Sequence, residues 1–122
     1  MSLLCLATAT SVFTLSLQSF TLAWTHSIEK VRWEEDYRIV GKQLEATEAR
    51  VQGSGAGMEP PPGALLKNGW WHYIPRQSWH NELRLTRSNY TNDYELCFDS
   101  RCRSLAELAP QQDGVTRVYP CK

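Results

Sequence analysis

Apolar and polar residues alternate along most of the chain, which is the pattern of strands with one buried face. The alternation is clearest over residues 20–26, where Phe20, Leu22 and Trp24 are separated by small or polar residues. It recurs over residues 31–40, with apolar side chains at positions 31, 33, 37 and 39. Further runs typical of strands cover residues 3–7, 12–17, 43–52, 82–87, 94–98 and 114–120.

Turn signals separate these runs. Gly41-Lys42 fits a two-residue hairpin turn with glycine first, and Asn68-Gly69 is the strongest short hairpin signal in the chain. Residues 53–63, rich in glycine and proline, predict a loop, and residues 104–108 predict one helical turn. The pattern therefore predicts an all-β fold, an antiparallel β-sandwich or partly open barrel of eight to ten short strands, as a single domain over residues 1–122.

The net charge and the N-terminal segment exclude some classes of function. Thirteen basic residues balance thirteen acidic ones, so no overall field attracts nucleic acid, and we expect no nucleic-acid partner. The first 24 residues lack a basic start, and their apolar run is broken by Thr, Ser and Gln. We interpret them as two strands, neither a leader nor a membrane span.

Four cysteines allow two disulfides. Cys97 and Cys102 fit the facing ends of a hairpin, and Cys5 and Cys121 can join the terminal strands. Buried free thiols and a metal site remain alternatives, although zinc sites usually need two close cysteine pairs.

The candidate site comes from glutamates that fall where a strand should bury apolar side chains. If the Gly41-Lys42 turn sets the register, Glu35 faces Glu48 and Trp33 faces Arg50 on the apolar face. Two carboxylates about 5 Å apart repel by about 3 kcal/mol at an effective dielectric constant near 20. We therefore expect a positive group to compensate them.

Four side chains are expected to converge on this face. Pairing Ser27 with Arg32 puts Trp24 beside Glu35 and His26 on the diagonal. His26, Glu35, Glu48 and Arg50 would then lie together, framed by Trp24 and Trp33. Such a cluster can be a closed ion network, a metal site that uses His26, or a pair of carboxylates sharing a proton.

A second candidate contact lies on the Asn68-Gly69 hairpin. Trp70 is expected on the opposite face from Trp71, where it can either contact a partner or cover a neighbouring sheet.

Three segments carry a resemblance to a known family: "FTLAWTHSIEKVRWEEDYRI", "EARVQGSGAGMEPPP" and "GWWHY". Over nearly everything from Cys5 to Cys121 the chain resembles the bacterial domain-of-unknown-function family numbered 1850. The resemblance implies a gene beside those of a TAXI-type TRAP solute transporter, whose substrates include small organic anions. Many relatives carry an N-terminal hydrophobic anchor, which implies a periplasmic location or the outer face of the inner membrane.

The family supplies no catalytic residues that can be carried over. We therefore expect a non-enzymatic accessory or binding module without a cofactor. Its expected partners are TRAP transporter subunits and a small organic anion, bound through the cluster or through Trp70. The alternative is a metal-binding protein or metal-dependent enzyme that uses His26, Glu35 and Glu48.

Overall fold

The structure is a computed structural model that describes residues 2–26, 30–53, 61–111 and 113–122. Within these residues the chain forms twelve strands and one short helix, which confirms the predicted all-β class with more strands than expected. The elements are β1 (Leu3–Ala7), β2 (Val12–Ser16), β3 (Ser19–Thr25), β4 (Arg32–Val40), β5 (Gln43–Gln52), β6 (Leu65–Lys67), β7 (Trp70–Tyr73), β8 (Trp79–His80), β9 (Leu83–Arg87), β10 (Glu95–Phe98), β11 (Arg101–Ser104), α1 (Leu105–Leu108) and β12 (Gly114–Pro120).

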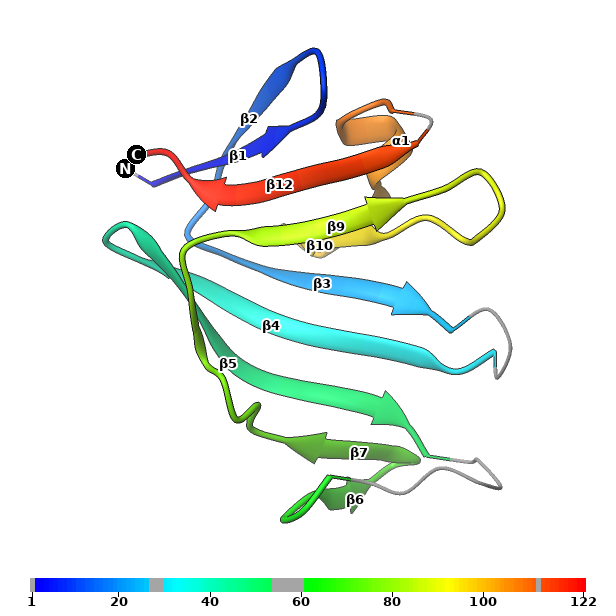
Figure 1. Cartoon of the computed structure of the whole chain (residues 1–122). Coiled ribbons are helices and arrows are strands. Elements are labelled where there is room, and N and C mark those ends of the chain that lie inside the picture. The colour runs from blue at the N-terminus through cyan, green and yellow to red at the C-terminus, as the bar shows by residue number, and fades with distance from the viewer. Residues whose placement is uncertain (1, 27–29, 54–60, 112) are drawn as a thin grey trace.

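The strands form two antiparallel sheets. The small sheet has the order β2-β1-β12-β9, and the large sheet has the order β11-β10-β3-β4-β5-β7-β6, with β8 paired to β5. Figure 1 shows the small sheet at one end of the curved large sheet, with β6 and β7 at the other end. The small sheet therefore covers only part of the face turned toward it, which we call the inner face of the large sheet.

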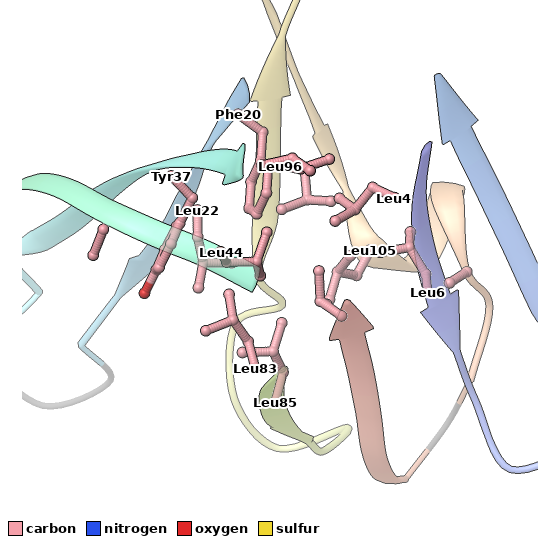
Figure 2. Close-up of a cluster of buried hydrophobic side chains, with 14 residues drawn as sticks. Leu4, Leu6, Phe20, Leu22, Tyr37, Leu44, Leu83, Leu85, Leu96 and Leu105 are labelled. Carbon is pink, nitrogen blue, oxygen red and sulfur yellow. The ribbon is translucent and has the colours of Figure 1, made fainter. Parts of the chain in front are cut away.

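Leucines from both sheets and from α1 make the hydrophobic core. Figure 2 shows Leu4, Leu44, Leu96 and Leu105 meeting between the layers, and all four are fully buried. Burial of one such side chain contributes about 1.5–3 kcal/mol. Tyr37 is also in this core, so the core reaches β4 but covers only part of the inner face.

A β-bulge interrupts the β4–β5 hairpin. Tyr37 faces Ala46, but Asp36 faces Glu48, so Thr47 is an extra residue on β5. A bulge of this kind bends the strand and increases its twist. Every pair beyond it is shifted by one residue relative to a regular hairpin, and this shift determines which side chains lie on which face.

The predicted turns and disulfides are confirmed. Gly41 has a φ of +62°, and Asn68 and Gly69 both have positive φ, as a tight hairpin turn requires. Disulfides join Cys5 to Cys121 and Cys97 to Cys102. Of the glycine-rich loop, residues 54–60 lie outside the described residues. No helix in the described part of the chain is long and apolar enough to cross a membrane.

Candidate functional site

The bulge sorts the charged residues of β4 and β5 onto opposite faces of the large sheet. Glu35 faces Ala49 on the inner face, whereas Glu48 faces Asp36 and Arg50 faces Glu34 on the other, outer face. The prediction that Glu35 faces Glu48 is therefore wrong. The physical reason is the extra residue Thr47, which shifts the pairing by one position and turns Glu48 and Arg50 away from the core.

The expected register between β3 and β4 is also wrong, by two residues. Leu22 lies opposite Glu35, and Trp24 lies opposite Trp33, with their rings stacked at 6.1 Å. His26 follows the end of β3, four residues beyond Leu22 and so about 13 Å along the chain direction. The expected convergence of His26, Glu35, Glu48 and Arg50 does not form.

The β-bulge and the shifted pairing of β3 with β4 also separate the three residues suggested as metal ligands. Glu35 lies on the inner face, Glu48 lies on the outer face, and His26 lies beyond the end of β3. Among the residues that the structure describes, no three His, Cys, Asp or Glu side chains are close enough together to hold a metal ion. The geometry therefore does not favour the metal-binding alternative.

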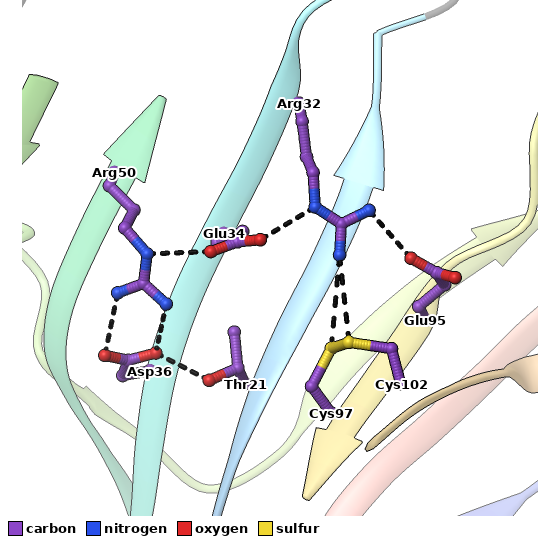
Figure 3. Close-up of a disulfide and its surroundings, with 8 residues drawn as sticks. All are labelled: Thr21, Arg32, Glu34, Asp36, Arg50, Glu95, Cys97 and Cys102. Carbon is purple, nitrogen blue, oxygen red and sulfur yellow. Dashed lines mark hydrogen bonds and ion pairs between the residues drawn. A yellow bond between two sulfur atoms is a disulfide. The ribbon is translucent and has the colours of Figure 1, made fainter. Parts of the chain in front are cut away.

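The outer face carries a ladder of ion pairs centred on Arg50. Its Nε donates to Glu34 at 2.7 Å, and its two terminal nitrogens donate to Asp36 at 2.9 and 3.1 Å. One of these nitrogens also contacts Glu48 at 3.0 Å. Figure 3 shows the fork-to-fork contact between Arg50 and Asp36. A planar guanidinium binds a carboxylate best in this bidentate geometry.

Arg32 extends the ladder to the neighbouring disulfide. It donates to Glu34 at 2.7 Å and to Glu95 at 2.8 Å, so Glu34 bridges the two arginines. A further nitrogen of Arg32 lies 4.0 and 3.9 Å from the sulfur atoms of Cys97 and Cys102 (Figure 3). The ladder therefore ties β5, β4 and β10 together across the outer face.

The protonation equilibria agree with a structural role for this ladder. Burial alone would raise the pKa of Glu34 and Asp36, but hydrogen bonds from the arginines outweigh it and hold both pKa values below the ordinary range. The hydrogen bond to Asp36 raises the pKa of Arg50. Both carboxylates and the guanidinium stay charged near neutral pH, with their charges already paired.

Glu35 has a different environment on the inner face. Its Oε1 accepts a hydrogen bond of 2.6 Å from the hydroxyl of Tyr37. It lines a cavity of about 510 Å³ together with Leu22, Trp24, Tyr37, His80, Glu82, Leu83, Arg84, Leu85 and Tyr94. Cavities of small-molecule sites have volumes of about 300–1,000 Å³.

Aromatic rings form much of this cavity. Trp24 packs against Tyr94 with ring centroids 6.2 Å apart, and Tyr37 meets the ring of His80 edge-on at 6.0 Å. Burial raises the pKa of Tyr37, Tyr73 and Tyr94, and the negative charge of Glu35 adds to the rise in each. These phenols therefore stay protonated and cannot carry charge near neutral pH.

A larger hollow of about 700 Å³ lies beside Asp36 and Arg50 on the outer face. Its two most buried charged groups bind each other, which leaves them little capacity for a ligand. Trp70 also lies on the outer face, half-buried opposite Gln52 and Lys67. The inner cavity is the better candidate site because the carboxylate of Glu35 is not bound to an arginine in this way.

Sequence reasoning missed several residues of both faces. The sequence pattern assigns no role to Arg32, Glu34 and Asp36 of the outer ladder or to Tyr94 of the inner cavity. The signal for the bulge was present in β5, where the apolar parity changes from Leu44 and Ala46 to Ala49 and Val51.

Comparison with known proteins gives one family. No curated protein and no solved structure matches the chain. Residues 20–105 match the family described as "Domain of unknown function (DUF1850)", a span that runs from β3 to the start of α1 and includes the outer ladder and Glu35. The chain therefore belongs to the DUF1850 family.

Proposed function

We propose that this protein is a non-enzymatic binding module that works outside the cytoplasm with a TAXI-type TRAP solute transporter. Its binding face is the inner face of the large sheet around Glu35. Its outer face, with the ion ladder and the Cys97–Cys102 disulfide, holds that sheet rigid.

The single observation that carries the binding role is the inner cavity. Its walls combine aliphatic and aromatic side chains with a carboxylate from the middle of a strand, on a part of the sheet where the core ends. Glu35 is half-buried and, among the described residues, its carboxylate pairs with no basic side chain, so an apolar residue at position 35 would serve the core at least as well. A binding site explains why a carboxylate stands there.

The disulfides support the location. Disulfides persist in oxidising compartments and are rare in the cytosol. All four cysteines of the chain are paired, and Cys5–Cys121 joins two strands near the opposite ends of the sequence. This supports the periplasm or the outer face of the inner membrane, the location that the family resemblance implies.

The family resemblance supports the choice of partner, because it implies a gene beside those of such a transporter. The test is affinity capture of the purified solute-binding and membrane subunits of the neighbouring transporter by the immobilised chain. We expect capture at micromolar concentration, lost with Glu35→Lys on the inner face. The matched charge reversal Glu48→Lys, on the outer face of the next strand, should keep it. No capture of either subunit by the folded wild-type chain would contradict the proposed partner.

A further inference from the structure

The charges around the inner cavity do not balance locally. Glu82, which also lines it, accepts hydrogen bonds from Arg84 and Arg117, both at 3.1 Å. Glu35 forms no ion pair with any Arg, Lys or His among the residues that the structure describes. Among the described residues that line this cavity, the charged group left without a counter-ion is therefore the negative Glu35.

The carboxylate of Glu35 is held in place with one oxygen still available. Tyr37, which is almost fully buried, donates to Oε1. Within the described residues, Oε2 accepts no side-chain hydrogen bond. A neutral phenol orients the carboxylate without cancelling its charge, so Oε2 can accept from a charged N–H donor.

The aromatic walls also favour a positively charged ligand. The faces of Trp and Tyr rings attract cations that lie within about 6 Å of the ring centroid. Trp24 and Tyr94 lie on the same cavity as Glu35, and the stacking of Trp24 on Trp33 fixes its ring. Trp24 lies on β3 and Trp33 lies on β4, so the same sheet positions both rings and the carboxylate.

For an anion, the described part of the chain offers no comparable partner in this cavity. Among the described residues that line it, the one arginine is Arg84, which is bound to Glu82 and has a side chain that is 62% exposed. A carboxylate ligand would have to displace that pair and approach the unpaired charge of Glu35. The small organic anion that the family resemblance implies is therefore disfavoured at this cavity by charge.

We propose that the inner cavity binds a small organic ammonium ion, with Glu35 as its counter-ion and Trp24 and Tyr94 as its aromatic walls. This inference rests on the proposed role of the inner face and adds the chemical class of its ligand. The cavity volume of about 510 Å³ lies within the range of small-molecule sites.

Isothermal titration calorimetry of the purified full chain, at neutral pH and constant ionic strength, tests the proposal. The probes are n-butylammonium and tetramethylammonium chloride, with n-butanol as the uncharged analogue and succinate as the anion. We expect both ammonium ions to give saturable binding, and n-butanol and succinate to give none. Glu35→Gln should weaken ammonium binding at least about tenfold.

Glu48→Gln is the matched control because it removes the same charge from the outer face, and it should change ammonium affinity by less than about twofold.

Three results would overturn the proposal: no saturable ammonium binding to the folded chain, equal affinity in Glu35→Gln, or tighter binding of succinate. The titration contains no transporter subunit. Ammonium binding without subunit capture would therefore reject the proposed partner alone, and capture without ammonium binding would reject the ligand class alone.

Discussion

Glu35 and Tyr37 are joined by a hydrogen bond of 2.6 Å between side chains two residues apart on β4. Residues at this spacing point to the same face of a strand, so the bond lies along the inner face. It connects Tyr37, which belongs to the buried core, to Glu35, which lies on the same face just outside that core. The contact sets the orientation of the carboxylate before any ligand binds.

Tyr37→Phe should destabilise the protein because the phenol of Tyr37 is nearly fully buried and bonded to a charged acceptor. We expect a loss of about 1.5–3 kcal/mol in the free energy of unfolding, measured by urea denaturation. Tyr90→Phe is the control, since Tyr90 is 94% exposed, and it should leave that free energy unchanged. Equal stability of the two variants would contradict the role given to the hydroxyl of Tyr37.

The same hydroxyl gives a prediction at alkaline pH. Burial and the charge of Glu35 raise the pKa of Tyr37 above its ordinary value of 10.0. The folded state therefore keeps a proton that the unfolded state releases, and the resulting stabilisation is lost as pH rises above about 10. The unfolding free energy of the wild type should fall more steeply over this range than that of Tyr37→Phe. Parallel curves would count against the raised pKa.

Arg50→Met should be strongly destabilising because it leaves three carboxylates on the outer face without their shared cation. We expect a loss of roughly 2–4 kcal/mol in urea denaturation, since the side chain of Arg50 is only 20% exposed. Arg38→Met removes a similar pair with Glu45, but Arg38 is 58% exposed, so that loss should stay below about 1 kcal/mol. Similar losses in both variants would show that the partial burial of the ladder does not increase its contribution to the free energy of unfolding.

Acid should weaken the ladder in a defined direction. Glu34 and Asp36 have pKa values below their ordinary values of 4.5 and 3.8, so they bind protons less readily in the folded state than in the unfolded state. Their stabilisation is complete above the ordinary values and is lost as pH falls through the lowered ones. The thermal midpoint should therefore drop between about pH 5 and about pH 2, and Arg50→Met should flatten that drop. An equally steep drop in Arg50→Met would contradict this assignment.

The two disulfides should contribute unequally. Cys5 and Cys121 are separated by 116 positions, whereas Cys97 and Cys102 are separated by 5. The chain-entropy model gives about 5 kcal/mol for the long loop and about 2 kcal/mol for the short one. Replacing Cys5 and Cys121 by Ser should therefore lower the free energy of unfolding more than replacing the other pair. The reverse order, measured by urea denaturation under non-reducing conditions, would contradict the model.

The alternation of apolar and polar residues predicted the fold class, and the turn residues predicted the two hairpin turns, because both signals are local in sequence. The number and positions of the four cysteines suggested the two disulfides. The placement of Glu35 and Glu48 was predicted wrongly, on one face instead of on opposite faces, because one inserted residue reverses every side chain beyond it. The change of apolar parity between Ala46 and Ala49 is the local signal that predicts the insertion.

The roles of the two faces depend on contacts between side chains of different strands, which the alternation within one strand does not encode. Arg50 meets Glu34 and Asp36 only because β4 and β5 pair with the shifted register. Tyr94 reaches the inner cavity from the segment that precedes β10, about 60 residues beyond Glu35 in sequence.

The separation of roles between adjacent glutamates is tested most directly by comparing Glu34→Gln with Glu35→Gln in urea denaturation. The two substitutions are chemically identical, and their side chains lie on opposite faces of one strand. We predict that Glu34→Gln lowers the free energy of unfolding by roughly 1–3 kcal/mol, because Glu34 bridges two arginines. Glu35→Gln should leave it unchanged or raise it, because it removes an unpaired charge while keeping an acceptor for Tyr37. A larger loss in Glu35→Gln than in Glu34→Gln would contradict the account.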